Sequence, residues 1–420
     1  MIIDNLKSGN QNSRKRISAK VRWEDCDRAP YDLYFETAEN HAQGFSCNPH
    51  AFLIASVIPA MHYGEQRVSI GEEICPELLE GLSDVMRFFR YWYYRPEKEL
   101  VRIESKVMPP KTVPNGRRRA GSFFSGGIDS FGTICANRMN YPTDHPRRIK
   151  DAFIVHGLEQ DDPEKFDYLL NSLKTFEDHD DFTIIPVYTN AYLNFRDEDA
   201  ANDFKFWRYE FGGAALASVA HAFSRRDFIV SIPSSSHLYE MEPWGTHPLV
   251  DAHFSSGDMR VVHDGLTLTR LDKIKLVADW DLALKHLRVC NRYKQYQEGR
   301  FNCGRCEKCV RTMLGLLAVG ALNKTDAFPV KDVSCELVQA CSNKLHNLSL
   351  LKPVYQEIIP ELERQNRHDL AAAVRKMLDP PKKHVWKKKI AQFDKKFLNS
   401  ELANLKKSIP LKGHKGPDGN

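Results

Sequence analysis

A short glycine-rich turn between a strand pattern and a helix pattern is the feature that most constrains this sequence of 420 residues. An apolar segment at 120–124 leads into a helical pattern at 130–139 through the run Ser125-Gly126-Gly127-Ile128-Asp129-Ser130. Two adjacent glycines let the backbone wrap around an anion, and a helix start presents free N–H groups and the positive end of its dipole. The turn is therefore predicted to bind phosphate.

The polar residues of the turn fit this interpretation. Ser125 and Ser130 would add hydroxyl donors, and Asp129 would hold Mg²⁺ or orient the loop. The turn lacks a Gly-Lys-Ser/Thr sequence and so is not a Walker loop. The alternative is an ordinary Gly-Gly turn capped by serine, which the upstream strand and the downstream helix make the weaker interpretation.

From residue 120 onward, strand and helix patterns alternate. Strand patterns recur at 152–155, 182–188, 228–232 and 287–289, and helical patterns at 163–177, 209–223, 269–280 and 310–322. This alternation is typical of an α/β fold with an open parallel sheet and helices on both faces. Ligands of such sheets gather at the carboxyl ends of the strands, where His156 ends the second predicted strand. His156 is either a nucleotide-binding residue or a histidine with ordinary strand-end contacts.

The chain has other regions on either side of this α/β domain, which is predicted to span 117–325. Residues 17–110 combine a helical pattern at 76–93 with strand patterns, among them the apolar run 52–58, and predict a small α+β domain. The polar residues 1–16 are expected to be disordered. The remaining predictions are a helical region at 330–407 and a disordered basic tail at 408–420.

Four cysteines form a cluster with metal-ligand spacing. Twelve residues separate the first pair and two residues separate each later pair in Cys290, Cys303, Cys306 and Cys309. Four thiolates complete a tetrahedral zinc shell and leave no open position, so the predicted zinc site is structural. An iron–sulfur cluster uses the same four ligands and is the main alternative. Unligated buried cysteines are the weaker alternative.

The two motifs together resemble a known superfamily. The run at 125–130 is similar to the SGGxDS motif of the PP-loop ATP pyrophosphatases, and the late cysteine cluster narrows the likeness to the 7-cyano-7-deazaguanine synthase (QueC) family. The resemblance covers about residues 119–322. It implies that ATP is cut between its α and β phosphates, that AMP is attached to an oxygen of the substrate, and that pyrophosphate sits in the loop with Mg²⁺. It also implies a structural zinc.

The resemblance suggests further site residues on a later helix. Lys273 is similar to the lysine with which PP-loop enzymes reach the ATP phosphates, and Arg270 lies one turn earlier on the same face. With Asp129 and Ser130, they form the predicted catalytic set. A solvated basic helix start is the alternative. A serine run after a strongly apolar strand lines either a substrate pocket or a polar loop, and it comprises Ser234, Ser235 and Ser236.

The family likeness predicts an ATP-dependent ligase that forms C–N bonds. A carboxylate of the deazaguanine type would be adenylated and then attacked by nitrogen to give an amide or a nitrile. Residues 17–110 and 330–420 have no counterpart in the compact synthase, which favours a relative with an altered acceptor, such as a protein amine or a nucleobase in an anti-phage defence system. A tRNA-thiolating enzyme and a non-enzymatic nucleotide-binding scaffold are the alternatives.

Charge and composition limit the partners. The segment 381–420 carries a net charge of +8 and the remainder −3, so electrostatic partners would be met by the tail. In the tail, an amphipathic basic helix is predicted from Trp386, Ile390, Phe393 and Phe397. It would pack on the protein itself, bind a partner or RNA, or touch a membrane. With neither a secretory signal nor a membrane span in the sequence, we expect a cytoplasmic protein. Whether it forms a homodimer stays open.

Overall fold

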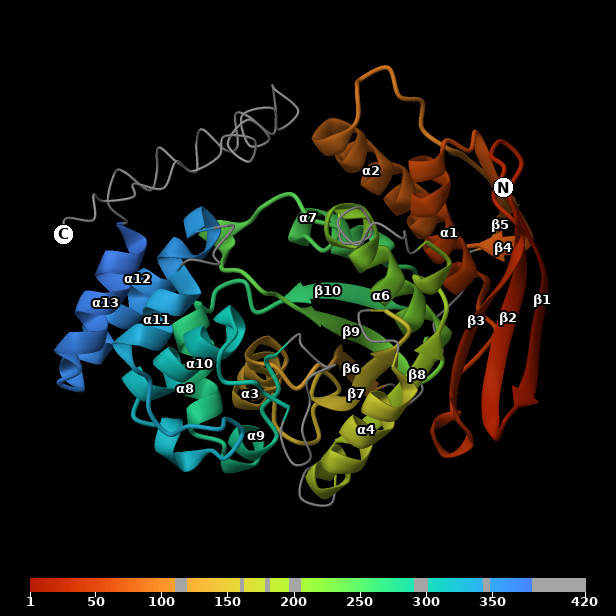
Figure 1. The fold of residues 1–420 in the computed structure, drawn as a ribbon. Coiled ribbons are helices and arrows are strands. Elements are labelled where there is room, and N and C mark those ends of the chain that lie inside the picture. Colours follow the sequence, from red (N-terminus) through yellow and green to blue (C-terminus); the bar gives the residue numbers. More distant parts are fainter. Residues whose placement is uncertain are drawn as a thin grey trace, which may run out of the picture. The chain divides into compact units, whose positions relative to one another are not determined.

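The computed structural model describes residues 1–109, 119–158, 162–177, 182–195, 205–290, 301–342 and 348–379 (Figure 1). The chain forms two compact units, which comprise residues 1–333 and 334–420. The first unit therefore joins the two regions that the sequence assigns to separate domains at 17–110 and 117–325. Residues 110–118, which connect these two regions, lie outside the described residues.

A single sheet accounts for that union. In the described residues, its ten strands lie in the order β10-β9-β6-β7-β8-β3-β2-β1-β4-β5. The five strands from β10 to β8 are parallel, and β3 joins them by antiparallel pairing with β8. The parallel strands are β6 (Arg119–Phe123), β7 (Ile149–His156), β8 (Thr183–Thr189), β9 (Asp227–Pro233) and β10 (Arg260–Asp264). The other strands are β1 (Ile2–Gln11), β2 (Arg14–Arg22), β3 (Tyr31–Ala38), β4 (Arg67–Ile74) and β5 (Arg102–Val107).

The prediction of disorder at 1–16 is wrong. β1 and β2 form an antiparallel hairpin across these residues, and β1 also pairs in parallel with β4. The hairpin turns at Asn12 and Ser13, whose φ values of 51° and 59° are those of a two-residue turn that matches strand twist. Ile3, Ile17, Ala19 and Val21 are buried on one face of the hairpin, whereas residues 7–11 are all exposed and include the polar residues that suggested disorder.

The apolar run 52–58 is a helix and not the predicted strand. It lies inside α1 (Pro49–Tyr63), where the Asn48 side chain accepts a hydrogen bond from the His50 N–H at 3.0 Å and Gly64 ends the helix with φ 85°. All residues from His50 to Met61 are buried. A helix that is buried all round shows no periodic pattern, so its apolar run resembles a buried strand.

Helices cover both faces of the parallel strands, as the alternating pattern predicts (Figure 1). Phe123, Phe153, Val187 and Val230 share one face, against which α6 (Gly212–Ala222) packs, and α1 packs on α6 and on β4. The opposite face receives α3 (Ile128–Asn140) and α4 (Pro163–Glu177), and α8 (Arg270–Ala278) packs on α3. Besides these, the first unit contains α2 (Pro76–Tyr93), α7 (Pro248–Asp251), α9 (Asp281–Lys285) and α10 (Glu307–Ala318).

Two further sequence expectations concern later segments. Residues 287–289 form no strand, because their backbone groups bond to the glycine-rich turn and to an asparagine side chain, as described below. The second unit contains α11 (Cys335–Ser342), α12 (Leu348–Arg364) and α13 (His368–Leu378), in line with its helical pattern. The predicted basic helix with Trp386 and Phe397, and the tail at 408–420, lie outside the described residues. Among the described residues, no helix is both long and apolar enough to cross a membrane.

Candidate functional site

The order of the parallel strands creates a position for a ligand at the carboxyl end of β6. Numbered from β6 along the chain, these strands lie in the order 5-4-1-2-3, which is the arrangement of doubly wound α/β sheets. The connections leave β6 and β9 in opposite directions, so a crevice opens at the carboxyl ends of these two neighbours. The glycine-rich turn follows β6 directly, and Ser234 follows β9.

The turn has the conformation that its glycines predict. Gly126 adopts φ 72°, a left-handed conformation that side chains other than glycine rarely take, and α3 begins at Ile128. The Gly127 N–H donates to Ser125 Oγ at 3.3 Å, and Ser130 Oγ donates to the Gly127 carbonyl at 3.0 Å. Both serine hydroxyls therefore bind backbone groups of Gly127 and hold the glycine-rich turn against the start of α3.

Asp129, Arg270 and Lys273 come together beside the turn. Arg270 donates to Asp129 Oδ1 at 2.7 Å, and Lys273 Nζ lies 3.7 Å from the same oxygen. Lys273 also donates to the Ser234 carbonyl at 2.6 Å, which ties α8 to the end of β9. A Cβ atom at Gly132 would lie 2.9 Å from Lys273 Cβ, so glycine lets α3 and α8 approach this closely.

Charge and burial set the ionisation of this group. Burial raises the pKa of Asp129, but Arg270 and Lys273 together outweigh it, so the pKa lies below its ordinary value. Burial lowers the pKa of Lys273, and Asp129 opposes that effect without cancelling it. The side chains of Arg270 and Lys273 are 10% and 2% exposed, against 24% for Asp129. Two sheltered cations thus face one carboxylate at a helix start, an arrangement suited to binding an anion.

The structure surrounds His156 with aromatic rings. Its ring centroid lies 5.1 Å from that of Phe166 on α4 and 5.7 Å from that of Tyr188 on β8. Gly157 follows with φ 93°, and a Cβ atom there would lie 1.8 Å from the Thr189 carbonyl oxygen. These contacts favour the packing role of His156 over nucleotide binding.

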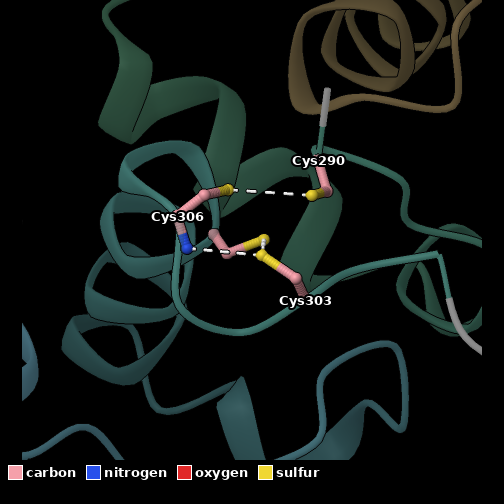
Figure 2. Close-up of side chains that lie close together, drawn as sticks. Cys290, Cys303 and Cys306 are labelled. Carbon is pink, nitrogen blue, oxygen red and sulfur yellow. Dashed lines mark hydrogen bonds between the residues drawn. The ribbon is translucent and has the colours of Figure 1, made fainter. Parts of the chain in front are cut away.

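The four clustered cysteines converge on one point. Their sulfur atoms all lie within 4.8 Å of one another. Figure 2 shows the Cys290 and Cys306 sulfurs facing each other at 3.7 Å, and Cys303 and Cys309 are 3.9 Å apart. A tetrahedral zinc with Zn–S bonds of about 2.3 Å would separate its sulfurs by about 3.8 Å, whereas a disulfide bond is about 2.05 Å long. The cluster can therefore hold a metal ion and is compatible with zinc.

Residues that the sequence did not single out support both sites. Asn302 accepts hydrogen bonds from the N–H groups of Val289 and Cys290 at 2.8 and 3.2 Å, and donates to the carbonyls of Leu287 and Ala327 at 2.7 and 2.9 Å. Asn302 thus supports the cysteine cluster, whereas Arg288 supports the phosphate-binding site by donating hydrogen bonds to the glycine-rich turn. Most of these bonds join a side chain to the backbone of a distant segment, for which the sequence carries no pattern.

Asp264, at the end of β10, is another residue that the sequence reasoning missed. Its carboxylate accepts a hydrogen bond from Ser231 Oγ at 2.9 Å, and its carbonyl accepts one from the Ser234 N–H at 2.7 Å. It also acts on Lys273, because its negative charge raises the pKa of that lysine against the larger effect of burial. The strand β10 was not predicted, so no signal placed Asp264 here.

A second group of metal-ligand type is a weaker candidate. Ligand atoms of His50, His221 and Asp258 lie within 4.8 Å of one another. However, His50 Nε2 accepts a hydrogen bond from the Cys75 N–H at 3.1 Å, so a neutral His50 carries its proton on Nδ1, which lies 3.9 Å from Asp258 Oδ1. That proton occupies the position through which His50 would bind an ion.

Comparison with known proteins adds no assignment. No protein-family model, no curated protein and no solved structure matches this chain.

Proposed function

We propose that this protein is an adenylate-forming ligase of the PP-loop ATP pyrophosphatase type, related to the 7-cyano-7-deazaguanine synthases. One observation carries the proposal. A turn with left-handed Gly126 opens α3 beside Asp129, Arg270 and Lys273, at the carboxyl ends of β6 and β9. Free N–H groups, a helix dipole and two sheltered cations at one point suit a pyrophosphate group.

The proposed reaction has two steps. A substrate carboxylate oxygen attacks the α-phosphorus of ATP, the bond to the β-phosphate oxygen breaks, and pyrophosphate leaves into the turn. An amine nitrogen then attacks the carbonyl carbon of the acyl adenylate, AMP leaves, and the amine loses a proton. Arg270 and Lys273 stabilise the charge that develops on pyrophosphate. Asp129 is the residue that would hold Mg²⁺, which neutralises phosphate charge when bound.

The cysteine centre has a supporting role in this proposal. Four thiolates fill a tetrahedral shell and leave no position for a substrate, so the ion stabilises the fold around residues 287–309. Zinc is the proposed ion because the sulfur separations of 3.7 and 3.9 Å match its bond lengths.

The tRNA-thiolation alternative requires a cysteine that carries a persulfide near the turn. Cys135 is the cysteine on α3, and its Sγ donates to the Leu276 carbonyl on α8 at 3.7 Å. This contact directs Cys135 into the α3–α8 packing and favours the ligase. We therefore propose a small carboxylate of the deazaguanine type as substrate and an amine, on a protein or a nucleobase, as acceptor.

A substrate panel tests this proposal. The protein is incubated with ATP, Mg²⁺, ammonium as a source of the amine, and either 7-carboxy-7-deazaguanine or unmodified tRNA, and AMP is measured by chromatography. AMP that depends on the acid supports the ligase. AMP that depends on tRNA alone would instead support the thiolation-type enzyme, and absence of AMP with both would favour a nucleotide-binding scaffold.

A further inference from the structure

We propose that Arg288 is a positioning residue through which the cysteine centre holds the phosphate-binding turn in its anion-binding shape. The inference rests on the proposed function, because it assigns a role to the turn during pyrophosphate binding. Arg288 lies two residues before Cys290, and both belong to the short segment 287–290 that connects the two sites.

Arg288 binds two consecutive carbonyl groups of the turn. Its backbone N–H donates to the Gly126 carbonyl at 2.7 Å, and its Nε–H donates to the Ser125 carbonyl at 2.9 Å. In a planar trans peptide, the carbonyl and the following N–H point in opposite directions. Holding these two carbonyls toward Arg288 therefore turns the N–H groups of Gly126 and Gly127 to the opposite side, where the Gly126 N–H can donate to an anion and the Gly127 N–H donates to Ser125 Oγ at 3.3 Å.

The segment that carries Arg288 is anchored to Asn302 by backbone hydrogen bonds. It forms neither helix nor strand, and Asn302 binds the backbone of its residues Leu287, Val289 and Cys290. Asn302 is followed directly by Cys303, a member of the cysteine cluster. A metal ion that joins Cys290 to Cys303 would therefore fix both segments that Asn302 connects, and with them the position of Arg288.

The arrangement couples metal occupancy to the geometry of the turn. Without the ion, the Cys290 and Cys303 segments lose the link that the metal provides, and the hydrogen bonds of Asn302 remain between them. Because coupling between two binding sites is reciprocal, the bound ion should strengthen pyrophosphate binding, and pyrophosphate should slow loss of the ion. Arg288 acts here through backbone geometry and not through its charge.

Two substitutions separate geometry from charge. Arg288→Lys keeps the positive charge but removes the Nε–H that binds the Ser125 carbonyl, and Arg288→Met removes both. Binding of magnesium pyrophosphate is measured by calorimetry, with Lys324→Ala, an exposed substitution, as the control. Both Arg288 variants should bind about tenfold more weakly, which corresponds to the loss of one hydrogen bond to a charged group, while zinc content stays unchanged. Wild-type affinity in Arg288→Lys would overturn the proposal.

A second measurement does not depend on pyrophosphate binding. Amide hydrogen exchange is followed in peptides that cover 121–130, in the zinc-loaded protein and after chelation, with circular dichroism to verify that the fold is retained. Exchange in the turn should become faster on chelation and return to its original rate when zinc is restored. Unchanged exchange would refute the coupling. A wild-type protein that shows this coupling but binds no pyrophosphate would contradict the proposed function alone.

Discussion

Asp129 is the residue on which the proposed chemistry depends most. It belongs to the first turn of α3, and its carboxylate is shared between Arg270 at 2.7 Å and Lys273 at 3.7 Å. A carboxylate beside a phosphate site is unfavourable unless it binds a cation or holds the cationic side chains in place. Both functions require its negative charge, which its lowered pKa preserves.

Asp129→Asn keeps the shape of this side chain and removes its charge. We expect kcat/KM for adenylate formation to fall at least about a hundredfold, because Mg²⁺ and the two cations lose their shared ligand. Steady-state AMP release measures the effect, and Asp279→Asn, at an exposed position on the C-terminal side of α8, is the matched control. Near-normal turnover in Asp129→Asn would remove this residue from the site.

The lowered pKa of Lys273 predicts a pH dependence of ATP binding. Only the protonated amine attracts phosphate, so affinity should fall as pH rises through this pKa, which lies below the ordinary lysine value of about 10.4. Lys273→Met should bind more weakly at neutral pH and show no further loss over the same interval. Calorimetric titrations between pH 7 and about pH 10 measure both. An identical alkaline decline in the two proteins would assign it to another group.

At this scale, the sequence selected the residues to which the proposal assigns the chemistry. The turn and Asp129 were selected from the motif, Lys273 from the family resemblance, and Arg270 from its spacing to Lys273. The structure brings them together. Arg288 and Asn302 were missed because they act by binding backbone carbonyl and N–H groups. Such bonds depend on which segments meet in the fold, and any polar side chain of suitable length can form them.

Among the elements, helices with clear end signals were predicted best. The bounds of α2 and α4 agree with the patterns at 76–93 and 163–177, each of which begins with a proline in the first turn. α1 was mistaken for a strand because its signals lie outside the apolar run, at Asn48 and Gly64. Its complete burial removes the polar stripe that identifies most helices.

The cap of α1 provides a test at the scale of the element. Asn48→Ala removes the acceptor for the His50 N–H and the donor to Ser224 Oγ at 2.9 Å. We expect a loss of about 1 to 2 kcal/mol in the free energy of unfolding. Asn48→Ser keeps a capping oxygen and should lose less. Denaturant unfolding monitored by circular dichroism measures both. Equal stability of the alanine variant and the wild type would show that the Asn48 side chain does not stabilise the protein by capping α1.

For the whole molecule, the continuous sheet was the least predictable feature. β3 pairs with β8 through Phe35↔Thr189, Glu36↔Tyr188 and Thr37↔Val187, residues that are about 150 positions apart in the chain. Strand patterns give the faces of a strand but not its neighbours, so the sequence suggested two domains where the described residues form one unit. The parallel half was easier, since alternating strands and helices leave few arrangements open.

The central claim is that the turn after β6 receives pyrophosphate from ATP, and the products of ATP cleavage test it most directly. ATP labelled at the α or the γ phosphate is incubated with the protein, Mg²⁺, 7-carboxy-7-deazaguanine and ammonium as a source of the amine, and the labelled products are separated. Cleavage between the α and β phosphates predicts that the α label appears in AMP and the γ label in pyrophosphate. Accumulation of ADP and inorganic phosphate, in amounts that depend on Asp129, would contradict the account.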